Sequence, residues 1–290
     1  MEVRQGANAR DVKGYDTERL RNDFLIQNLF PADDFKLVYS QIDRIIVGGC
    51  MPVNKELTLE AGSELKAAYF LERREMGIFN VGGNGSVIVD GTEYKFKYRD
   101  GLYIGMGSKE IKFKSEDSSK PAKFYFNSTP AHKTYPTVFI DPEKDIKDEF
   151  KLQLGSVEGC NKRLNRKYIL PGQVETCQLE MGITTLEPGS VWNTMPCHTH
   201  DRRMEVYFYF EIPEEDIRNK RISFGVEEAW EGVHVSGTPD SAYYYSTYNA
   251  EDKNPVSTAS ATHAYAFIWG MAGENQDFDD MDWVDMKDLK

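Results

Sequence analysis

The chain has 290 residues, of which 40% are hydrophobic and 28% charged, a composition typical of a globular protein with one long domain or two shorter ones. Its 35 basic and 47 acidic residues give a net charge of -12, which disfavours binding to a nucleic-acid backbone. No apolar run approaches the roughly 18 residues that a membrane span requires, so we expect neither a nucleic-acid nor a membrane partner.

The N-terminal region lacks the apolar core of a signal peptide, so we expect no export. Residues 17–25 mix charged residues with leucine and predict a short helix with Thr17 as its N-cap. The cysteines have no paired spacing, which favours reduced thiols and a cytoplasmic location. They are Cys50, Cys160, Cys177 and Cys197.

From about residue 35 onward, short runs of β-branched and aromatic residues alternate with glycine-rich turns, which is typical of antiparallel sandwiches and barrels. The pair Asp90-Gly91 predicts a hairpin turn. A polar stretch from Thr129 to Asp148 predicts a connection, after which the β-rich pattern resumes. The predicted strands include 36–40, 44–49, 67–71, 77–85, 86–89, 101–105, 111–113 and 122–126. In the second half, residues 175–182 lead to 184–190, a strand followed by a Pro-Gly turn, and further strands are 205–210, 221–224 and 264–270.

The segment 192–210 contains two of the five histidines of the chain, His198 and His200, and then Glu205. Positions i and i+2 of an extended strand face the same side, so the two imidazoles can point to one centre. Glu205 would open the next strand and face the same cavity. Two imidazoles and one carboxylate can bind a divalent metal and leave coordination positions open, as catalytic sites do. The alternative is a pair of surface histidines beside a strand.

Three residues near this segment are candidates for substrate binding. Tyr207 lies on the strand face of Glu205 and could donate a hydrogen bond to a sugar hydroxyl, although an ordinary aromatic core would look the same. Arg202 and Arg203 could bind a substrate carboxylate, because a guanidinium group pairs with it through two hydrogen bonds. Their alternative role is a solvated turn. An anionic substrate of so acidic a chain would need a locally positive pocket.

The order of Pro188-Gly189, a strand, the two histidines and Glu205 resembles the first metal motif of the cupin barrels. Residues 85–91 and 99–110 resemble the second motif, but Lys109 and Glu110 stand where a metal-binding cupin places histidine. The resemblance implies a mainly all-β fold of two cupin-like β-barrels, or jelly rolls, in tandem, with short helices and a C-terminal extension. The expected domains are a degenerate cupin without metal over 1–140 and a metal-binding cupin over 141–290.

Further stretches, spread over nearly the whole chain, carry a more specific resemblance. They are residues 19–22, 38–40, 42–49, 69–75, 121–125, 192–210, 267–271, 273–276, 278–282 and 287–289. They resemble the family of 4-deoxy-L-threo-5-hexosulose-uronate ketol-isomerases. The resemblance implies a cytoplasmic, homohexameric bicupin of pectin and uronate breakdown that binds one Zn2+ per chain. It also implies conversion of 5-dehydro-4-deoxy-D-glucuronate into 3-deoxy-D-glycero-2,5-hexodiulosonate.

One segment departs from the family pattern. The family takes a fourth zinc ligand from a histidine ten residues before the position of Phe267, and Ser257 stands there in this chain. Residues 225–262 also fail to match. Because serine is a poorer zinc ligand than imidazole, three possibilities remain open. His263 or His234 could supply the ligand, three protein ligands and water could hold the metal, or the site could be impaired.

Aldose–ketose isomerisation moves a proton between adjacent carbons through an enediolate, whose charge a chelated metal stabilises. The sequence does not identify the catalytic base; a hydroxide on the metal or a nearby carboxylate would serve. Two other functions remain open. One is a non-catalytic or impaired bicupin that binds uronate sugars or has a structural role. The other is an iron-dependent cupin dioxygenase, which uses the same three ligand types.

Overall fold

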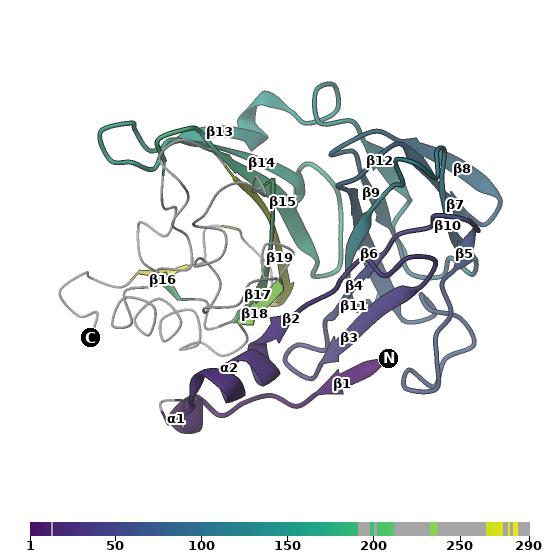
Figure 1. Cartoon of the computed structure of the whole chain (residues 1–290), viewed down its shortest axis with the longest axis horizontal. Helices are drawn as coiled ribbons and strands as arrows, with labels where there is room; N and C mark the ends of the chain where they lie inside the picture. The colour runs from purple at the N-terminus through teal and green to yellow at the C-terminus, as the bar shows by residue number, and fades with distance from the viewer. Residues whose placement is uncertain are drawn as a thin grey trace. The chain divides into compact units, whose positions relative to one another are not determined.

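The computed structural model describes residues 1–12, 14–190, 198–199, 202–211, 233–236, 265–274, 278 and 281–283 (Figure 1). The chain divides into two compact units. Unit 1 comprises Met1–Arg4, Asn28–Lys147 and Tyr168–Met181, and unit 2 comprises Gln5–Gln27, Asp148–Lys167 and Gly182–Lys290. Each unit is therefore assembled from separate segments of the chain. The predicted domain boundary after residue 140 stays a prediction.

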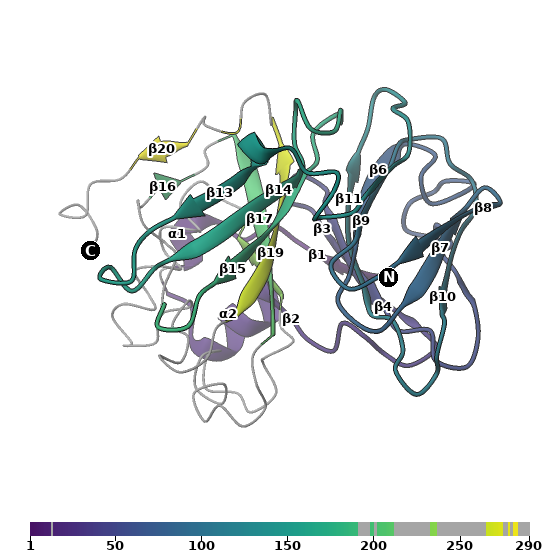
Figure 2. The ribbon, with the colours of Figure 1, turned by 90° about the horizontal axis from the view of Figure 1, so that it is seen from above.

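Unit 1 consists of two sheets that lie face to face (Figure 2). Its strands are β1 (Glu2–Arg4), β3 (Phe35–Ser40), β4 (Ile46–Cys50), β5 (Leu57–Thr58), β6 (Arg74–Asn80), β7 (Gly85–Val89), β8 (Thr92–Phe96), β9 (Gly101–Ile104), β10 (Ile111–Ser115), β11 (Phe124–Pro130) and β12 (Val138–Ile140). One sheet has the order β1-β3-β4-β11-β6-β9-β12, and the other has the order β5-β10-β7-β8. Apart from the parallel pair β1–β3, both sheets are antiparallel, and two packed antiparallel sheets are the architecture of a jelly roll.

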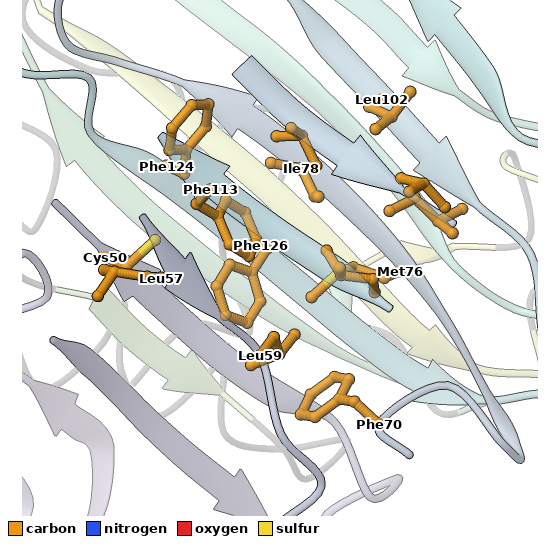
Figure 3. Packing of buried hydrophobic residues seen from close by; sticks show 14 of the residues in the cluster. Cys50, Leu57, Leu59, Phe70, Met76, Ile78, Leu102, Phe113, Phe124 and Phe126 are labelled. Atoms are coloured by element: carbon orange, nitrogen blue, oxygen red, sulfur yellow. The ribbon is translucent and has the colours of Figure 1, made fainter. Parts of the chain in front are cut away.

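Aromatic side chains from both sheets fill the interior of unit 1 (Figure 3). Phe113 of β10 packs on Phe124 and Phe126 of β11, with ring centroids 5.3 and 5.9 Å apart. All three side chains are fully buried, and each such burial stabilises the fold by about 1.5–3 kcal/mol. Cys50 lies in the same cluster, where burial raises the pKa of its thiol well above the usual range. The two sheets are therefore held together by close apolar packing.

Most predicted strands of unit 1 are present, and the Asp90-Gly91 hairpin is confirmed. Both turn residues have positive φ, 47° and 84°, and β7 pairs with β8 on either side of them. The predicted strand 67–71 is wrong, because this segment forms turns. Its apolar residues Phe70 and Leu71 are nevertheless buried in the core, so their pattern reflects burial rather than strand structure.

Unit 2 has one seven-stranded sheet, a two-stranded pair and two short helices among its described residues. The elements are α1 (Ala9–Val12), α2 (Thr17–Phe24), β2 (Leu25–Ile26), η1 (Asp148–Phe150), β13 (Lys151–Leu154), β14 (Arg163–Ile169), β15 (Glu180–Leu186), β16 (His198–Thr199), β17 (Arg203–Phe210), β18 (Val233–Ser236), β19 (Ala266–Gly273) and β20 (Asp282–Trp283). The large sheet has the order β13-β14-β15-β19-β17-β18-β2, and β16 pairs with β20. The predicted strand 221–224 lies outside the described residues.

The predicted helix near the N-terminus is confirmed as α2, but its N-cap is Asp16 rather than Thr17. The Asp16 carboxylate accepts a hydrogen bond from the backbone N–H of Arg19 at 2.8 Å. Within the described ranges, the helices are too short and too polar to cross a membrane. The expectation of a mainly all-β chain is confirmed, and several sheets of this kind are what a cupin-type fold requires.

Candidate functional site

Strand β17 has one polar side and one apolar side, because successive side chains of a strand point in opposite directions. The apolar side consists of Met204, Val206, Phe208 and Phe210, all buried. The other side carries Arg203, Glu205, Tyr207 and Tyr209. We call it the polar side of the unit 2 sheet. Strand β19 pairs with β17 along its whole length and places Phe267 against both tyrosine rings, at 5.3 and 5.7 Å.

Glu205 is a buried carboxylate in the middle of this polar side. It is 8% exposed and is the third residue of β17, not the first as the sequence predicted. The Tyr207 hydroxyl donates a hydrogen bond to it. Burial, followed by the charge of Glu205 and this hydrogen bond, raises the pKa of Tyr207, and burial and Glu205 raise that of Tyr209. Both tyrosines therefore stay protonated near neutral pH and act as hydrogen-bond donors rather than bases.

His198 lies on a different element of unit 2, the short strand β16. The tail strand β20 pairs with it and places Trp283 opposite His198. The two rings meet edge to face, with centroids 5.6 Å apart and planes at 66°. The imidazole is half-buried, whereas Trp283 is 60% exposed. The predicted extended conformation at His198 is thus present, and the C-terminal tail contributes to the surroundings of the imidazole.

The predicted set of three metal ligands is described only in part. His200, Ser257 at the expected position of the fourth ligand, and the fourth-ligand candidate His263 lie outside the described residues. The backbone of His234 is described in β18, where it lies opposite Tyr207 in the strand register. In the parts of the chain that the structure covers, no three His, Cys, Asp or Glu residues group as metal ligands. The ligand set His198, His200 and Glu205 therefore stays a prediction.

The two adjacent arginines occupy different environments. Arg202 precedes β17 and is exposed, whereas Arg203 opens the strand and is 5% exposed. Arg203 lies on the polar side with Glu205, and its Nη2 atom donates a hydrogen bond to the backbone carbonyl of Phe278 at 2.9 Å. Of the two candidates for a substrate carboxylate, only Arg203 thus shares the side of Glu205.

The sequence did not predict a group of residues next to the polar side of the unit 2 sheet. These residues lie on β14, on β19 and in the C-terminal tail. Trp269 donates from Nε1 to Asn165 Oδ1 at 3.1 Å and contacts the ring of Phe278 with centroids 5.6 Å apart. Lys167 Nζ lies 3.7 Å from the centroid of Phe278. In the sequence, four of the first five residues of β14 are charged or polar, so the segment lacks the apolar alternation that predicts a strand.

The family model for the KduI/IolB family matches residues 25–286 of the chain. A 4-deoxy-L-threo-5-hexosulose-uronate ketol-isomerase from Lachnospira eligens is 87% identical over 290 residues and covers the whole of both chains. Proteins of the same name from Lachnoclostridium phytofermentans and Enterobacter are 55% and 46% identical, again over the full length of both chains.

Among solved structures, an IolB-like protein from Salmonella typhimurium superposes with a TM-score of 0.58. It is 14% identical and covers 90% of this chain and 96% of its own. At that identity the similarity concerns the fold alone, and it extends across both units of the chain.

Proposed function

The chain belongs to the KduI/IolB family, and on that basis we propose that it is a ketol-isomerase of uronate sugars in pectin and uronate breakdown. Its reaction would convert 5-dehydro-4-deoxy-D-glucuronate into 3-deoxy-D-glycero-2,5-hexodiulosonate. The observation that carries this proposal is the 87% identity to a protein that bears the name of this isomerase. The identity extends over the full length of both chains. The relatives at 55% and 46% identity bear the same name.

We propose that His198, His200 and Glu205 hold one divalent cation, Zn2+, per chain. Imidazole nitrogen and carboxylate oxygen are ordinary zinc ligands, and three protein ligands leave a position for substrate. The environment of Glu205 fits this role, because the carboxylate is buried and Tyr207 donates a hydrogen bond to it. Such a hydrogen bond orients a ligating carboxylate and is common around metal sites. Because Ser257 stands at the family position of the fourth ligand, that place would be taken by His263, by His234 or by water.

The reaction moves one proton from the hydroxyl-bearing carbon to the adjacent aldehyde carbon and a second proton between their oxygens. A bound cation would polarise both oxygens and stabilise the negative charge that develops on them. Tyr207 and Tyr209 would bind hydroxyl groups as donors, because their raised pKa values keep them protonated. The neighbouring aromatic residues of β19 would limit the access of water to this side of the sheet.

The proposal is tested by incubating the purified protein with 5-dehydro-4-deoxy-D-glucuronate in D2O and following the proton NMR spectrum. We expect the signal of the proton on the aldehyde carbon to disappear and the signal of a hydroxymethyl group that carries solvent deuterium to appear. His198→Ala should abolish the conversion. Metal without turnover would favour the non-catalytic bicupin, and a requirement for oxygen would favour the iron-dependent dioxygenase.

The assembly and the cellular location are proposals of the same kind. The family resemblance of the sequence implies a homohexamer in the cytoplasm. Light scattering of the purified protein should then give a mass six times that of one chain. A monomeric mass would contradict the assembly without affecting the proposed reaction.

A further inference from the structure

Two buried cationic side chains lie near the same aromatic ring in unit 2. The Nζ atom of Lys167 lies 3.7 Å from the centroid of the Phe278 ring, and Cζ of Arg203 lies 6.0 Å from it. Arg203 also donates a hydrogen bond to the backbone carbonyl of Phe278. The side chains are 8% and 5% exposed. A cation over an aromatic face is held in place electrostatically, so the ring of Phe278 positions both cations.

This pair lies on the polar side of the unit 2 sheet. Asn165 of β14 reaches Trp269 of β19 on that side, and Lys167 is two residues farther along the same strand, so it projects in the same direction. The ring of Phe278 contacts that of Trp269 at an interplanar angle of 51°, and the partner of Trp269 in the strand register is Tyr207. The two cations therefore share a side of the sheet with the candidate metal ligand on β17.

The net charge of the polar side is opposite in sign to the net charge of the whole chain. The chain as a whole carries a net charge of -12. In the described parts of β14, β15, β17 and β19, the polar side instead carries three cations, Arg163, Lys167 and Arg203, and two carboxylates, Glu180 and Glu205. An anionic sugar is repelled by most of an acidic surface and is attracted to a local positive site of this kind.

We propose that Lys167 and Arg203 together bind the carboxylate of the sugar and make the site specific for uronates. The inference rests on the proposed function and extends it, because Lys167 was not a candidate from the sequence. A guanidinium group and an ammonium group differ in geometry: Arg203 can pair with both carboxylate oxygens, and Lys167 supplies a point charge. The carboxylate is at the opposite end of the sugar from the reacting carbons, so holding it there orients the aldehyde end toward Glu205.

The test compares four proteins: wild type, Lys167→Met, Lys167→Arg and the control Lys162→Met. The methionine removes the charge and keeps most of the apolar length, and the arginine restores the charge. Lys162 is a partly exposed residue of unit 2 that pairs with Glu187, so its variant has the same net charge as Lys167→Met. Titration calorimetry with D-glucuronate and with D-glucose measures binding without any need for turnover.

We expect Lys167→Met to weaken binding of D-glucuronate by at least about 30-fold and to leave binding of D-glucose unchanged. Lys167→Arg should recover most of that affinity, and Lys162→Met should behave like wild type. With the full substrate, KM should rise far more than kcat falls. Equal affinity of wild type and Lys167→Met for D-glucuronate, or no binding by wild type, would overturn the inference.

The experiments distinguish a failure of this inference from a failure of the proposed function. If wild type does not isomerise the uronate but Lys167→Met still loses affinity for D-glucuronate, the isomerase proposal fails and the carboxylate site stands. If wild type isomerises the uronate and Lys167→Met has an unchanged KM, the isomerase proposal stands and the carboxylate site fails. Melting curves of all four proteins show whether a variant has lost its fold, and Lys167→Arg then decides the outcome.

Discussion

At the scale of single residues, Glu205 is a charged residue of the candidate site that lies in a buried environment. Its carboxylate is buried, and Tyr207 donates a hydrogen bond to it. Burial of a carboxylate is costly unless other groups compensate its charge, and a bound cation would provide that compensation. The position therefore suits a ligand better than a group that only packs in the core.

Replacing Glu205 by Gln tests this role. The amide keeps the size of the side chain but loses the negative charge that a hard divalent cation needs, so we expect at least about a 100-fold loss of metal affinity and of kcat/KM. Metal content by mass spectrometry and initial rates measure the two effects. Glu211→Gln, at the exposed residue that directly follows the same strand, is the matched control. Unchanged metal content in Glu205→Gln would remove this residue from the ligand set.

At the scale of elements, the segment that leads into β15 is fixed by one buried carboxylate. Glu75 of β6 is fully buried and accepts hydrogen bonds from the backbone N–H groups of three consecutive residues at 2.8–2.9 Å. They are Cys177, Gln178 and Leu179. The Tyr103 hydroxyl donates a further hydrogen bond to the carboxylate at 2.7 Å. Glu75 thus attaches a distant segment of the chain to the sheet of unit 1.

Glu75→Gln should lower the free energy of unfolding by about 2–4 kcal/mol, because the amide nitrogen cannot accept these hydrogen bonds and leaves buried N–H groups unpaired. Equilibrium unfolding in urea measures the change. Glu110→Gln, which removes an equal charge from an exposed ion pair with Lys112, should change stability by no more than about 1 kcal/mol. Equal effects of the two substitutions would show that Glu75 is not a structural anchor.

The contact between β15 and β19 requires a glycine. A Cβ atom on Gly182 would lie 2.2 Å from Cζ2 of Trp269 and 2.5 Å from the carbonyl oxygen of Arg166. Trp269 must therefore shift if a side chain is added, and its hydrogen bond to Asn165 would break. The polar side of the unit 2 sheet depends on this close approach of the two strands.

Gly182→Ala should destabilise the protein by about 1–3 kcal/mol and alter the near-ultraviolet circular dichroism of tryptophan. We also expect a lower rate of isomerisation, because Trp269 contacts Phe278, which holds the two cations. Gly14→Ala is the control, since the nearest atom to its added Cβ would be 3.6 Å away. A Gly182→Ala protein with wild-type spectrum, stability and rate would contradict this account of the packing.

At the scale of the whole molecule, the sequence predicted the class of fold and many of its strands. Alternating apolar residues and the Asp90-Gly91 turn are local signals, and the structure confirms them. The error at 67–71 has a physical reason, because buried turns need apolar residues as much as strands do.

The parts of the site that the sequence did not predict depend on contacts between distant residues. Lys167 and Phe278 lie far apart in the chain, and Lys167 belongs to none of the stretches that carry the family resemblance. Glu75 and the backbone of Cys177 meet in the same way. The spacing of His198, His200 and Glu205 was visible in the sequence because all three lie within one short segment, although His200 is outside the described residues.

The central claim is that one divalent cation, bound by Glu205 and the two histidines, is required for isomerisation of a uronate. The most direct measurement is the initial rate of apoprotein, prepared with a chelator, as zinc is added in steps. We predict that the rate rises from near zero and saturates at about one equivalent per chain. A rate that does not depend on zinc, or a titration of Glu205→Gln apoprotein that coincides with that of wild type, would contradict the claim.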